Sequence, residues 1–399
     1  MTTATQAPVD DEKGHIDPAS ALVGRAPVPI QTRSGRPWSF DPADFATPTG
    51  REVNWKHTPV DRVKSLLVNE EAPHDVIGVE VIAPDVVVQR RLAKGEAPRG
   101  EVFRPEDLPS AIAWEQESDS PLVSIPAGVE LDEPVYIRLT GRGGVAHAHV
   151  VLEAQPNSRG TVVLRHEGTA EQSQNVEIIV RDGASLTVIS VQRWDDDAVH
   201  LSAHQARVDR DATLTHIVAS LGGGVVRVNP SVELSGSGAQ GKLYGLAFAD
   251  AGQHLESQVY LHHKGPHTKG DVLYKGALQG ESARSVWIGD VLIGPDAVGT
   301  DSYEANRNLV LTDGARADSI PNLEIETGDI AGAGHASATG RFDDEQLFYL
   351  QARGIPEDEA RRLVVIGFLA EIVQKIGIPS LKEEFTAAIE AELASGAAS

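Results

Sequence analysis

The stretch DGASLTV, residues 182–188, combines a tight turn with a short apolar segment, and two similar stretches follow it. RDATLTH and SGAQGKLYG repeat the turn and again place a leucine after it. The three leucines are Leu186, Leu214 and Leu243, which lie 28 (214 − 186) and 29 (243 − 214) residues apart. Repeats of this length are typical of stacked coils, in which each coil buries its apolar side chains against the coils above and below.

The same pattern of short apolar segments and turns extends on both sides of these repeats, from about residue 121 to residue 330. Short Val, Ile and Leu runs alternate with Gly, Asp, Asn and Ser turns, and almost no helical period is present. Strands are predicted at residues 135–139, 149–154, 161–166, 176–180, 185–191, 213–219, 242–248, 285–293 and 308–312. This region is longer than a usual β-sandwich. We therefore predict a mainly β fold with a parallel β-helix (solenoid), and a large sandwich or jelly roll is the alternative.

The charge balance and the lack of cysteine exclude several classes of function. The chain has 399 residues, 58 acidic and 35 basic side chains, a net charge of -23 and no cysteine. Such a negative balance argues against a nucleic-acid partner, because phosphate binding needs a basic face. Without cysteine the chain has neither disulfides nor thiolate ligands. The first residues resemble no secretory signal, and the most apolar run, residues 363–373, is too short to span a bilayer. We expect a cytoplasmic protein.

The segments around the β region divide the chain into four parts. Residues 1–35 are predicted to form a disordered tail, 36–115 an N-terminal helical and mixed region, 116–336 the β-helix core and 337–399 a C-terminal helical unit. Within the second part, a short amphipathic helix is predicted at residues 61–71 and strands at residues 76–92.

Three helices are predicted in the C-terminal unit. The first begins at Asp343 or Asp344 and ends before Gly354. The second starts with the acidic cluster after Pro356 and is closed by Gly377. Ser380 and Glu383 form a capping-box pattern that opens the third helix.

Common catalytic signatures are missing from the sequence. It has no P-loop, no G-x-G-x-x-G opening a helix, no H-E-x-x-H and no G-x-S-x-G. A β-solenoid carbohydrate enzyme remains an alternative, because it needs only a few carboxylates on one face.

Several of the 14 histidines occur in groups. Two pairs share a strand face if extended and are interpreted as polar positions of the β region: His147 with His149, and His200 with His204. Three others surround a Gly-Pro turn, where imidazoles either converge on a metal or face solvent: His262, His263 and His267. His335 stands alone among small residues and cannot hold a metal by itself, because a stable site needs three or four ligands. Taken alone, it is interpreted as a turn residue.

The C-terminal third carries the most specific pattern. The stretch GHASATGRFDDEQLFYLQARGI, residues 334–355, together with residues 274–333 and 356–373, resembles the SufB/SufD family of iron–sulfur cluster assembly proteins. PTGREVNWKHTPVDRVKSLL, residues 48–67, is similar to a second family segment, and VSIPAGVELDEPVYI, residues 123–137, to a third. The length, the missing cysteines and the residues EVNWKHT favour the SufD branch.

The resemblance implies a right-handed parallel β-helix between helical ends, and a non-catalytic scaffold role. A SufD-type chain pairs with SufB through the β-helix and binds a SufC ATPase through its C-terminal helices. The family histidine that faces a SufB cysteine falls on His335, and a cysteine found two residues earlier in some members is Ala333 here. Iron or an Fe–S cluster would be shared transiently with SufB, ATP would be bound by SufC, and no cofactor would be held stably by this chain alone.

Two surfaces are predicted to contact these partners. One is the edge strand at residues 320–327, with Asn322, Leu323, Glu324 and Ile325 as candidates. The other is the helical unit, where candidate anchors are the aromatic side chains Phe348, Tyr349 and Phe368. For each aromatic residue, packing within the helical unit is the alternative. The isolated chain could also form a homodimer through the same edge strand, which leaves a homodimeric interaction protein as a further hypothesis.

Overall fold

The computed structural model describes residues 35–73, 76–342 and 344–396 of the chain. The predicted disordered tail therefore lies outside the described residues, apart from residue 35. In the described part of the chain, the first strand is preceded by 3-10 turns at Pro42–Asp44, Val60–Arg62 and Lys64–Leu67. The remaining elements of the N-terminal region are β1 (Ile77–Ile82), β2 (Val88–Ala93), α1 (Leu108–Gln116) and β3 (Asp119–Ile125).

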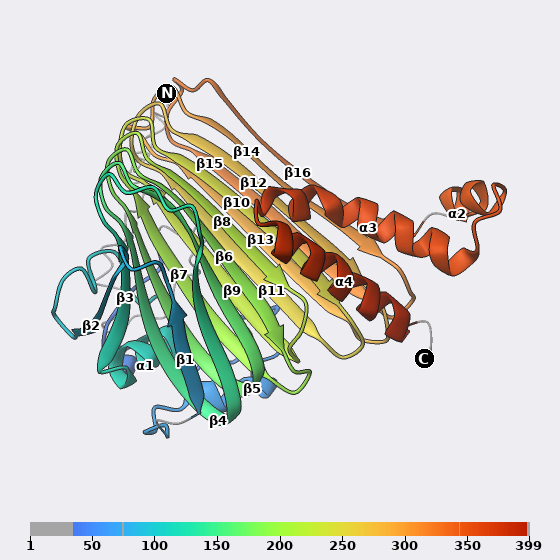
Figure 1. The fold of residues 1–399 in the computed structure, drawn as a ribbon, viewed down its shortest axis with the longest axis horizontal. Coiled ribbons are helices and arrows are strands. Elements are labelled where there is room, and N and C mark those ends of the chain that lie inside the picture. The colour runs from blue at the N-terminus through green and yellow to red at the C-terminus, as the bar shows by residue number, and fades with distance from the viewer. Residues whose placement is uncertain (1–34, 74–75, 343, 397–399) are drawn as a thin grey trace, which may run out of the picture.

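A parallel β-solenoid follows and confirms the predicted fold class (Figure 1). Its strands are β4 (Val135–Ala154), β5 (Arg159–Val180), β6 (Ser185–Trp194), β7 (Val199–Val208), β8 (Thr213–Ser220), β9 (Val225–Leu234), β10 (Gln240–Ala249), β11 (His254–His263), β12 (Lys269–Leu278), β13 (Arg284–Ile293), β14 (Asp301–Val310), β15 (Arg316–Ile325) and β16 (Gly332–Arg341).

Each coil of the solenoid contributes one strand to each of two sheets. The even-numbered strands from β6 to β16 pair in parallel, and so do the odd-numbered strands from β7 to β15. The long strand β5 joins the two sheets, because its first half pairs with β6 and its second half with β7. At the N-terminal end, β1 and β2 close the solenoid with antiparallel pairs to β4 and β3. At the other end, β15 pairs only with β13 and β16 only with β14 among the described strands.

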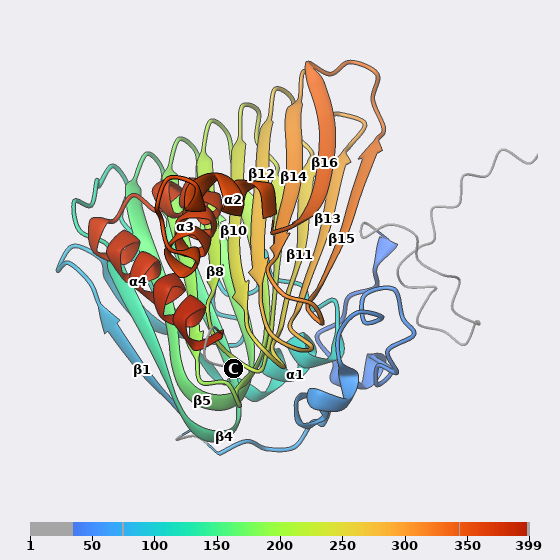
Figure 2. The same ribbon diagram turned by 90° about the vertical axis from the view of Figure 1, so that its right-hand side faces the viewer.

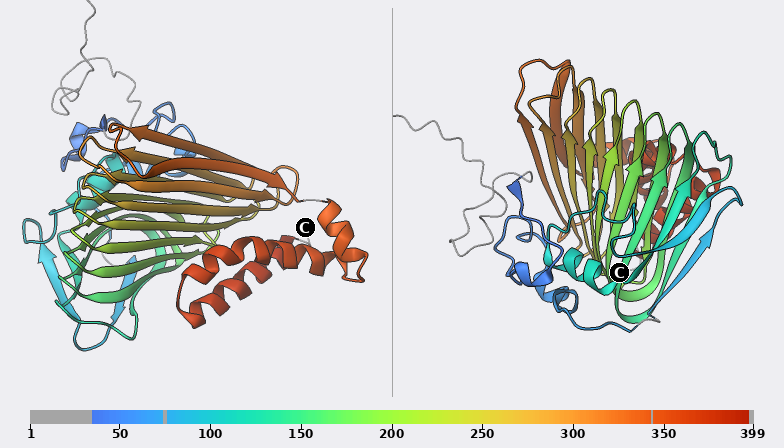
Figure 3. Two further views of the ribbon diagram at one scale, coloured as in Figure 1. Left: turned by 90° about the horizontal axis from the view of Figure 1, so that it is seen from above. Right: turned by 90° about the vertical axis from the view of Figure 1, so that its left-hand side faces the viewer.

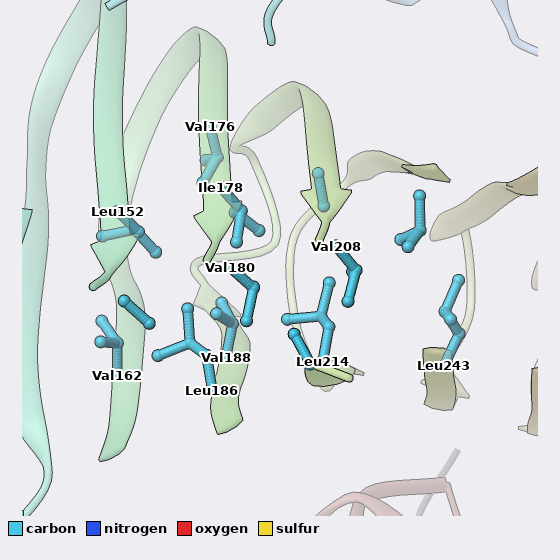
Figure 4. Packing of buried hydrophobic residues seen from close by; sticks show 14 of the residues in the cluster. Leu152, Val162, Val176, Ile178, Val180, Leu186, Val188, Val208, Leu214 and Leu243 are labelled. Atoms are coloured by element: carbon cyan, nitrogen blue, oxygen red, sulfur yellow. The ribbon is translucent and has the colours of Figure 1, made fainter. Parts of the chain in front are cut away.

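The core between the sheets is built by residues at equivalent positions of successive coils (Figure 4). Leu186 pairs with Leu214, as the 28-residue repeat predicts. The next step differs, because Leu214 is aligned with Gly241, and Leu243 with His216. Leu243 is thus two residues out of register with the other leucines. It still belongs to the same buried cluster, since side chains in a strand alternate with a period of two.

A ladder of left-handed turn residues holds the coils in register. Asn157, Gly183, Asp211, Gly238, His267 and Gly299 all have positive φ. Each donates its backbone N–H to a carbonyl of the next coil: Asp182, Arg210, Ser237, Pro266, Val298 and Asp329. The first five of these acceptors stand just before the next left-handed residue. Gly, Asn and Asp tolerate this backbone conformation best. The coil repeat is therefore fixed by the turns more than by the leucines.

Each outer face of the solenoid is covered in part (Figures 2 and 3). The helices α3 (Glu357–Lys375) and α4 (Pro379–Gly396) lie on the even-numbered sheet, where Leu369 and Phe385 join a cluster with Ile217 and Leu246. On the odd-numbered sheet, the N-terminal segment packs through apolar side chains such as Trp55 and Leu66. Helix α2 (Asp344–Gln351) projects beyond the sheet edge (Figure 1). None of the described helices is both long and apolar enough to cross a membrane.

Three details differ from the sequence-based expectations. The predicted helix at residues 61–71 is wrong, because two 3-10 turns stand there. Helix α4 begins at Pro379, so Ser380 lies inside the helix instead of capping it. The predicted domain boundary at residue 336 falls within β16, which continues to Arg341. The ends of the other two helices agree with the prediction, since Gly354 and Gly377 follow them with positive φ.

Candidate functional site

His335 lies in the middle of β16, the last strand of the solenoid, and is not a turn residue. Its strand pairs on one side with β14, where it is aligned with Glu304. The other edge of β16 has no partner among the described strands. The His335 side chain is 45% exposed. The imidazole therefore stands at the open end of the solenoid, where a second molecule can approach it.

The carboxyl group of Glu304 lies directly behind this imidazole. The Nδ1 atom of His335 is 3.8 Å from Oε1 of Glu304, whose side chain is only 1% exposed. This distance is too long for a hydrogen bond. Neither carboxyl oxygen has a hydrogen-bond partner among the described residues. Burial, and then the negative charge of Asp290, raise the pKa of Glu304 to about 8, so the group is largely protonated at neutral pH.

Local packing makes room for this carboxyl group. Gly289 lies opposite it on β13, and a Cβ atom there would overlap both Oε2 of Glu304 and the ring of Trp287. The indole N–H of Trp287 and the hydroxyl of nearby Tyr274 also lack hydrogen-bond partners among the described residues. The last coils thus hold several buried polar groups that the described residues leave without a hydrogen-bond partner.

Comparison with known proteins relates this arrangement to a family. Residues 137–368 match the model of the SUF system FeS cluster assembly, SufBD core domain. An iron-sulfur cluster assembly SufBD family protein of Mycobacterium bovis is 48% identical over 363 residues, which cover 89% of this chain and 91% of that protein.

The chain belongs to the SufBD family of iron–sulfur cluster assembly proteins.

Two relatives from one organism differ in their similarity to this chain. A SufBD family protein of Mycobacterium leprae is 46% identical over 89% of this chain and 93% of its own length. A second SufBD family protein of M. leprae is 28% identical over 64% of this chain, but the match covers only 30% of that protein. That organism therefore has one family member resembling this chain throughout and another that is much longer.

The predicted edge strand ends the other sheet at the same open end. Asn322, Leu323, Glu324 and Ile325 all belong to β15. Leu323 packs against the core between the sheets, whereas Ile325 is exposed. Asn322 donates a hydrogen bond to Asp290, with 2.7 Å between the two atoms. In this family member β15 and β16 each have one edge without a partner among the described strands, and these two terminal strands lie side by side at the end that carries His335.

The three candidate aromatic anchors occupy different environments. Phe348 and Tyr349 on α2 are 72% and 57% exposed. The guanidinium of Arg353 lies 3.5 Å from the centre of the Tyr349 ring. Phe368 instead packs against the solenoid, where the Nζ atom of Lys275 lies 4.8 Å from the centre of its ring. Of the three, only Phe348 and Tyr349 are exposed.

The three histidines near the Gly-Pro turn do not converge. His262 and His263 are successive residues of β11, so their side chains point to opposite faces. His263 interacts with the hydroxyl groups of Thr268 and Ser302. His267 occupies the left-handed turn ladder. In the described part of the chain, no group of three or more His, Asp or Glu side chains is placed to hold a metal.

The remaining grouped histidines lie on different sides of the sheets. His200 and His204 are buried inside the solenoid, where they contact histidines of the opposite sheet. His149 is instead buried under the N-terminal region, with its ring against Phe103 and Trp114. The Nε2 atom of His149 lies 3.3 Å from Glu177, and Nδ1 of His204 lies 2.9 Å from Nε2 of His216. Burial lowers the pKa of His200 and of His204 well below the ordinary value, so both are neutral. His147 is also largely buried, and burial lowers its pKa to about 4. His200 and His204 thus belong to a polar part of the solenoid interior, and His149 to a polar contact beneath the N-terminal region. Neither pair forms an exposed polar face.

Proposed function

We propose that this chain is a SufD-type, non-catalytic scaffold subunit, which pairs at the open end of its solenoid with a cysteine-bearing SufB-type homologue. A nascent Fe–S cluster is the cargo assembled between the two subunits. The observation that carries the proposal is the half-exposed His335 on an unpaired edge strand of a chain without cysteine. Thiolates are the main ligands of such clusters, so they must come from the partner.

The geometry of the open end supports pairing through strands. Unpaired N–H and C=O groups along β15 and β16 can bond to strands of a second solenoid, which continues the sheets across the interface. The longer second family member of M. leprae makes a paralogue a reasonable partner. Because thiolate chemistry needs reduced thiols, we place the complex in the cytoplasm.

The C-terminal helices supply the second surface. Phe348 and Tyr349 are joined by Leu363 of α3, which is also exposed. Large apolar side chains exposed on the helices of one unit are typical of a protein–protein contact. We assign this surface to a SufC-type ATPase, whose ATP hydrolysis would drive assembly.

Co-purification tests both surfaces in one experiment. The full chain is co-expressed with a cysteine-bearing family member and the ATPase, and each partner is quantified after affinity capture of the chain. Both should be retained by the full chain. A chain ending at residue 342 should keep the homologue and lose the ATPase.

A point variant separates the helical surface from general unfolding. Replacing both Phe348 and Tyr349 by Ala should weaken ATPase binding at least about tenfold, because exposed aromatic anchors carry much of an interface's binding energy. Trp38→Ala, at an exposed aromatic residue of the N-terminal region, is the matched control and should have no effect. Retention of the ATPase by the truncated chain would contradict the assigned surface.

A further inference from the structure

We propose that Glu304 and His335 together form the two protein ligands, one oxygen and one nitrogen, of a divalent-cation site of the ferrous-iron class at the open end of the solenoid. The inference deepens the proposed function, because it names what this chain contributes to the shared site. It starts from the carboxyl group of Glu304, which is buried and has no hydrogen-bond partner in the part of the chain that the structure describes.

The alignment of the two strands directs both side chains to the same place. β14 and β16 are parallel and in register, with Glu304 opposite His335. Directly aligned residues of neighbouring strands point to the same face of the sheet. Because β16 is the terminal strand, no described strand covers His335, and its side chain is 45% exposed. Glu304, one strand further in, is only 1% exposed. A cation entering beside the imidazole would therefore meet the carboxyl group behind it.

The separation of the two atoms suits a shared ion. Metal–nitrogen and metal–oxygen bonds of about 2.1 Å at a tetrahedral angle place two ligand atoms about 3.4 Å apart. The observed distance between Nδ1 of His335 and Oε1 of Glu304 is 3.8 Å. A small rotation of the half-exposed imidazole closes the difference. An imidazole with a carboxylate is a donor set for iron and zinc, and not for the larger alkaline-earth cations.

The energetics of Glu304 also point to a ligand. A buried polar group without a partner costs about 1–3 kcal/mol. Protonation removes the charge of the Glu304 carboxyl but still leaves its O–H without an acceptor among the described residues. Gly289 keeps the space for this carboxyl open, as a larger residue would not fit. A bound cation would satisfy the group, and the partner subunit would complete the coordination on the exposed side.

The site can be tested in the isolated full chain, using Co²⁺ as the probe. Paramagnetic broadening of the His335 ring resonance, assigned by its loss in His335→Ala, reports binding at this position. Glu304→Gln should weaken Co²⁺ binding at His335 at least about tenfold, since removing even an outer partner of a metal ligand costs about 10–100-fold in affinity. Glu304→Asp, which keeps the carboxyl group but shortens it, should weaken binding as well.

Glu326→Gln is the matched control, because Glu326 is exposed just after β15 and should not change the affinity. Far-UV circular dichroism and thermal unfolding check that each variant is folded. If Glu304→Gln and Glu304→Asp both bind Co²⁺ at His335 as tightly as the wild-type chain, or if millimolar Co²⁺ leaves the His335 resonance unchanged, the inference is wrong. The experiment needs no partner, so its failure is distinct from a failure of subunit pairing.

Discussion

The guanidinium carbon of Arg227 lies 4.1 Å from the centre of the Trp55 ring, and this stacking joins the N-terminal segment to the middle of the solenoid. The same guanidinium donates hydrogen bonds to the Asn54 carbonyl at 2.9 Å and to Glu256 at 3.2 Å. The hydroxyl of Thr58 donates a hydrogen bond to Oε2 of Glu256, whereas Arg227 donates to Oε1. The motif around Trp55 is therefore a structural anchor, in which a buried ion pair on the solenoid is covered by the segment that precedes it.

Trp55→Ala should release this segment. The Trp55 ring is buried, and truncation of a buried aromatic residue to Ala costs about 3–5 kcal/mol. Hydrogen exchange should become faster between residues 36 and 70, with little change in the solenoid strands. Trp38→Ala, at an exposed tryptophan of the same region, is the control. Unchanged exchange in Trp55→Ala would show that other contacts hold the segment.

The carboxylate of Glu256 should make stability depend on pH. Burial raises the pKa of Glu256, but the hydrogen bond from His254 and the charge of Arg227 outweigh it and lower the pKa from 4.5 to about 2. A group with a lowered folded pKa stabilises the protein above its unfolded pKa, and this stability is lost as the pH falls toward the folded pKa. The contribution is about 3 kcal/mol, since one pKa unit is about 1.4 kcal/mol.

A comparison of wild-type protein with Glu256→Gln isolates this effect from other acidic groups. The difference in free energy of unfolding, measured with urea, should be constant above about pH 4.5 and shrink steadily toward pH 2. A difference that stays the same across this range would mean that the Glu256 carboxylate has an ordinary pKa.

The position of His267 in the ladder of left-handed turn residues gives it a backbone role that needs no metal. Its φ is +57°, and the equivalent residues of the neighbouring coils are Gly238 and Gly299. His267→Gly should therefore change the free energy of unfolding by less than about 1 kcal/mol, because relief of the left-handed conformation offsets the added chain entropy. His267→Val should destabilise the protein by about 1–2 kcal/mol or more. Urea unfolding distinguishes the two, and equal effects would argue against a backbone role.

The docking of the C-terminal helices depends on apolar side chains facing the even-numbered sheet. Leu369 is fully buried in this contact, whereas Leu363 on the same helix is exposed. Leu369→Ala should cost about 2–5 kcal/mol of docking energy and make α3 and α4 more sensitive to limited proteolysis. Leu363→Ala should leave proteolysis unchanged. Equal sensitivity of both variants would show that the helices do not dock through this face.

The sequence supports prediction of the solenoid and the C-terminal helices because their signals are local. Turn residues and alternating apolar segments specify strands, and Gly354 and Gly377 specify helix ends. The predicted alignment of Leu243 with Leu214 was wrong by two residues. The register of the coils follows hydrogen bonds between turns, and these pair residues far apart in the chain. The predicted helix at residues 61–71 failed for a similar reason, since packing of Leu66 on the solenoid overrides local propensity.

Glu304 could not be recognised from the sequence as a buried residue, because helices α3 and α4 cover the outer face of its sheet. In β14, Ser302, Glu304, Asn306 and Asn308 are buried and alternate with a more apolar set that includes Ala305 and Leu309. Hydrophobic patterning would place the apolar set inside and Glu304 outside. The helices α3 and α4 bury that apolar set from outside, so the rule points to the wrong face. The exposure of Phe368 could not be predicted either, because it depends on which face of α3 docks onto the solenoid.

The central claim is that this chain supplies only half of an assembly site. The most direct measurement is the iron and sulfide content of the anaerobically purified protein, alone and as the complex with its cysteine-bearing homologue and the ATPase. The isolated chain should hold no cluster, the complex should hold one, and His335→Ala should leave complex formation intact while reducing cluster content. A stable cluster on the isolated chain, or normal cluster content in the His335→Ala complex, would contradict the account.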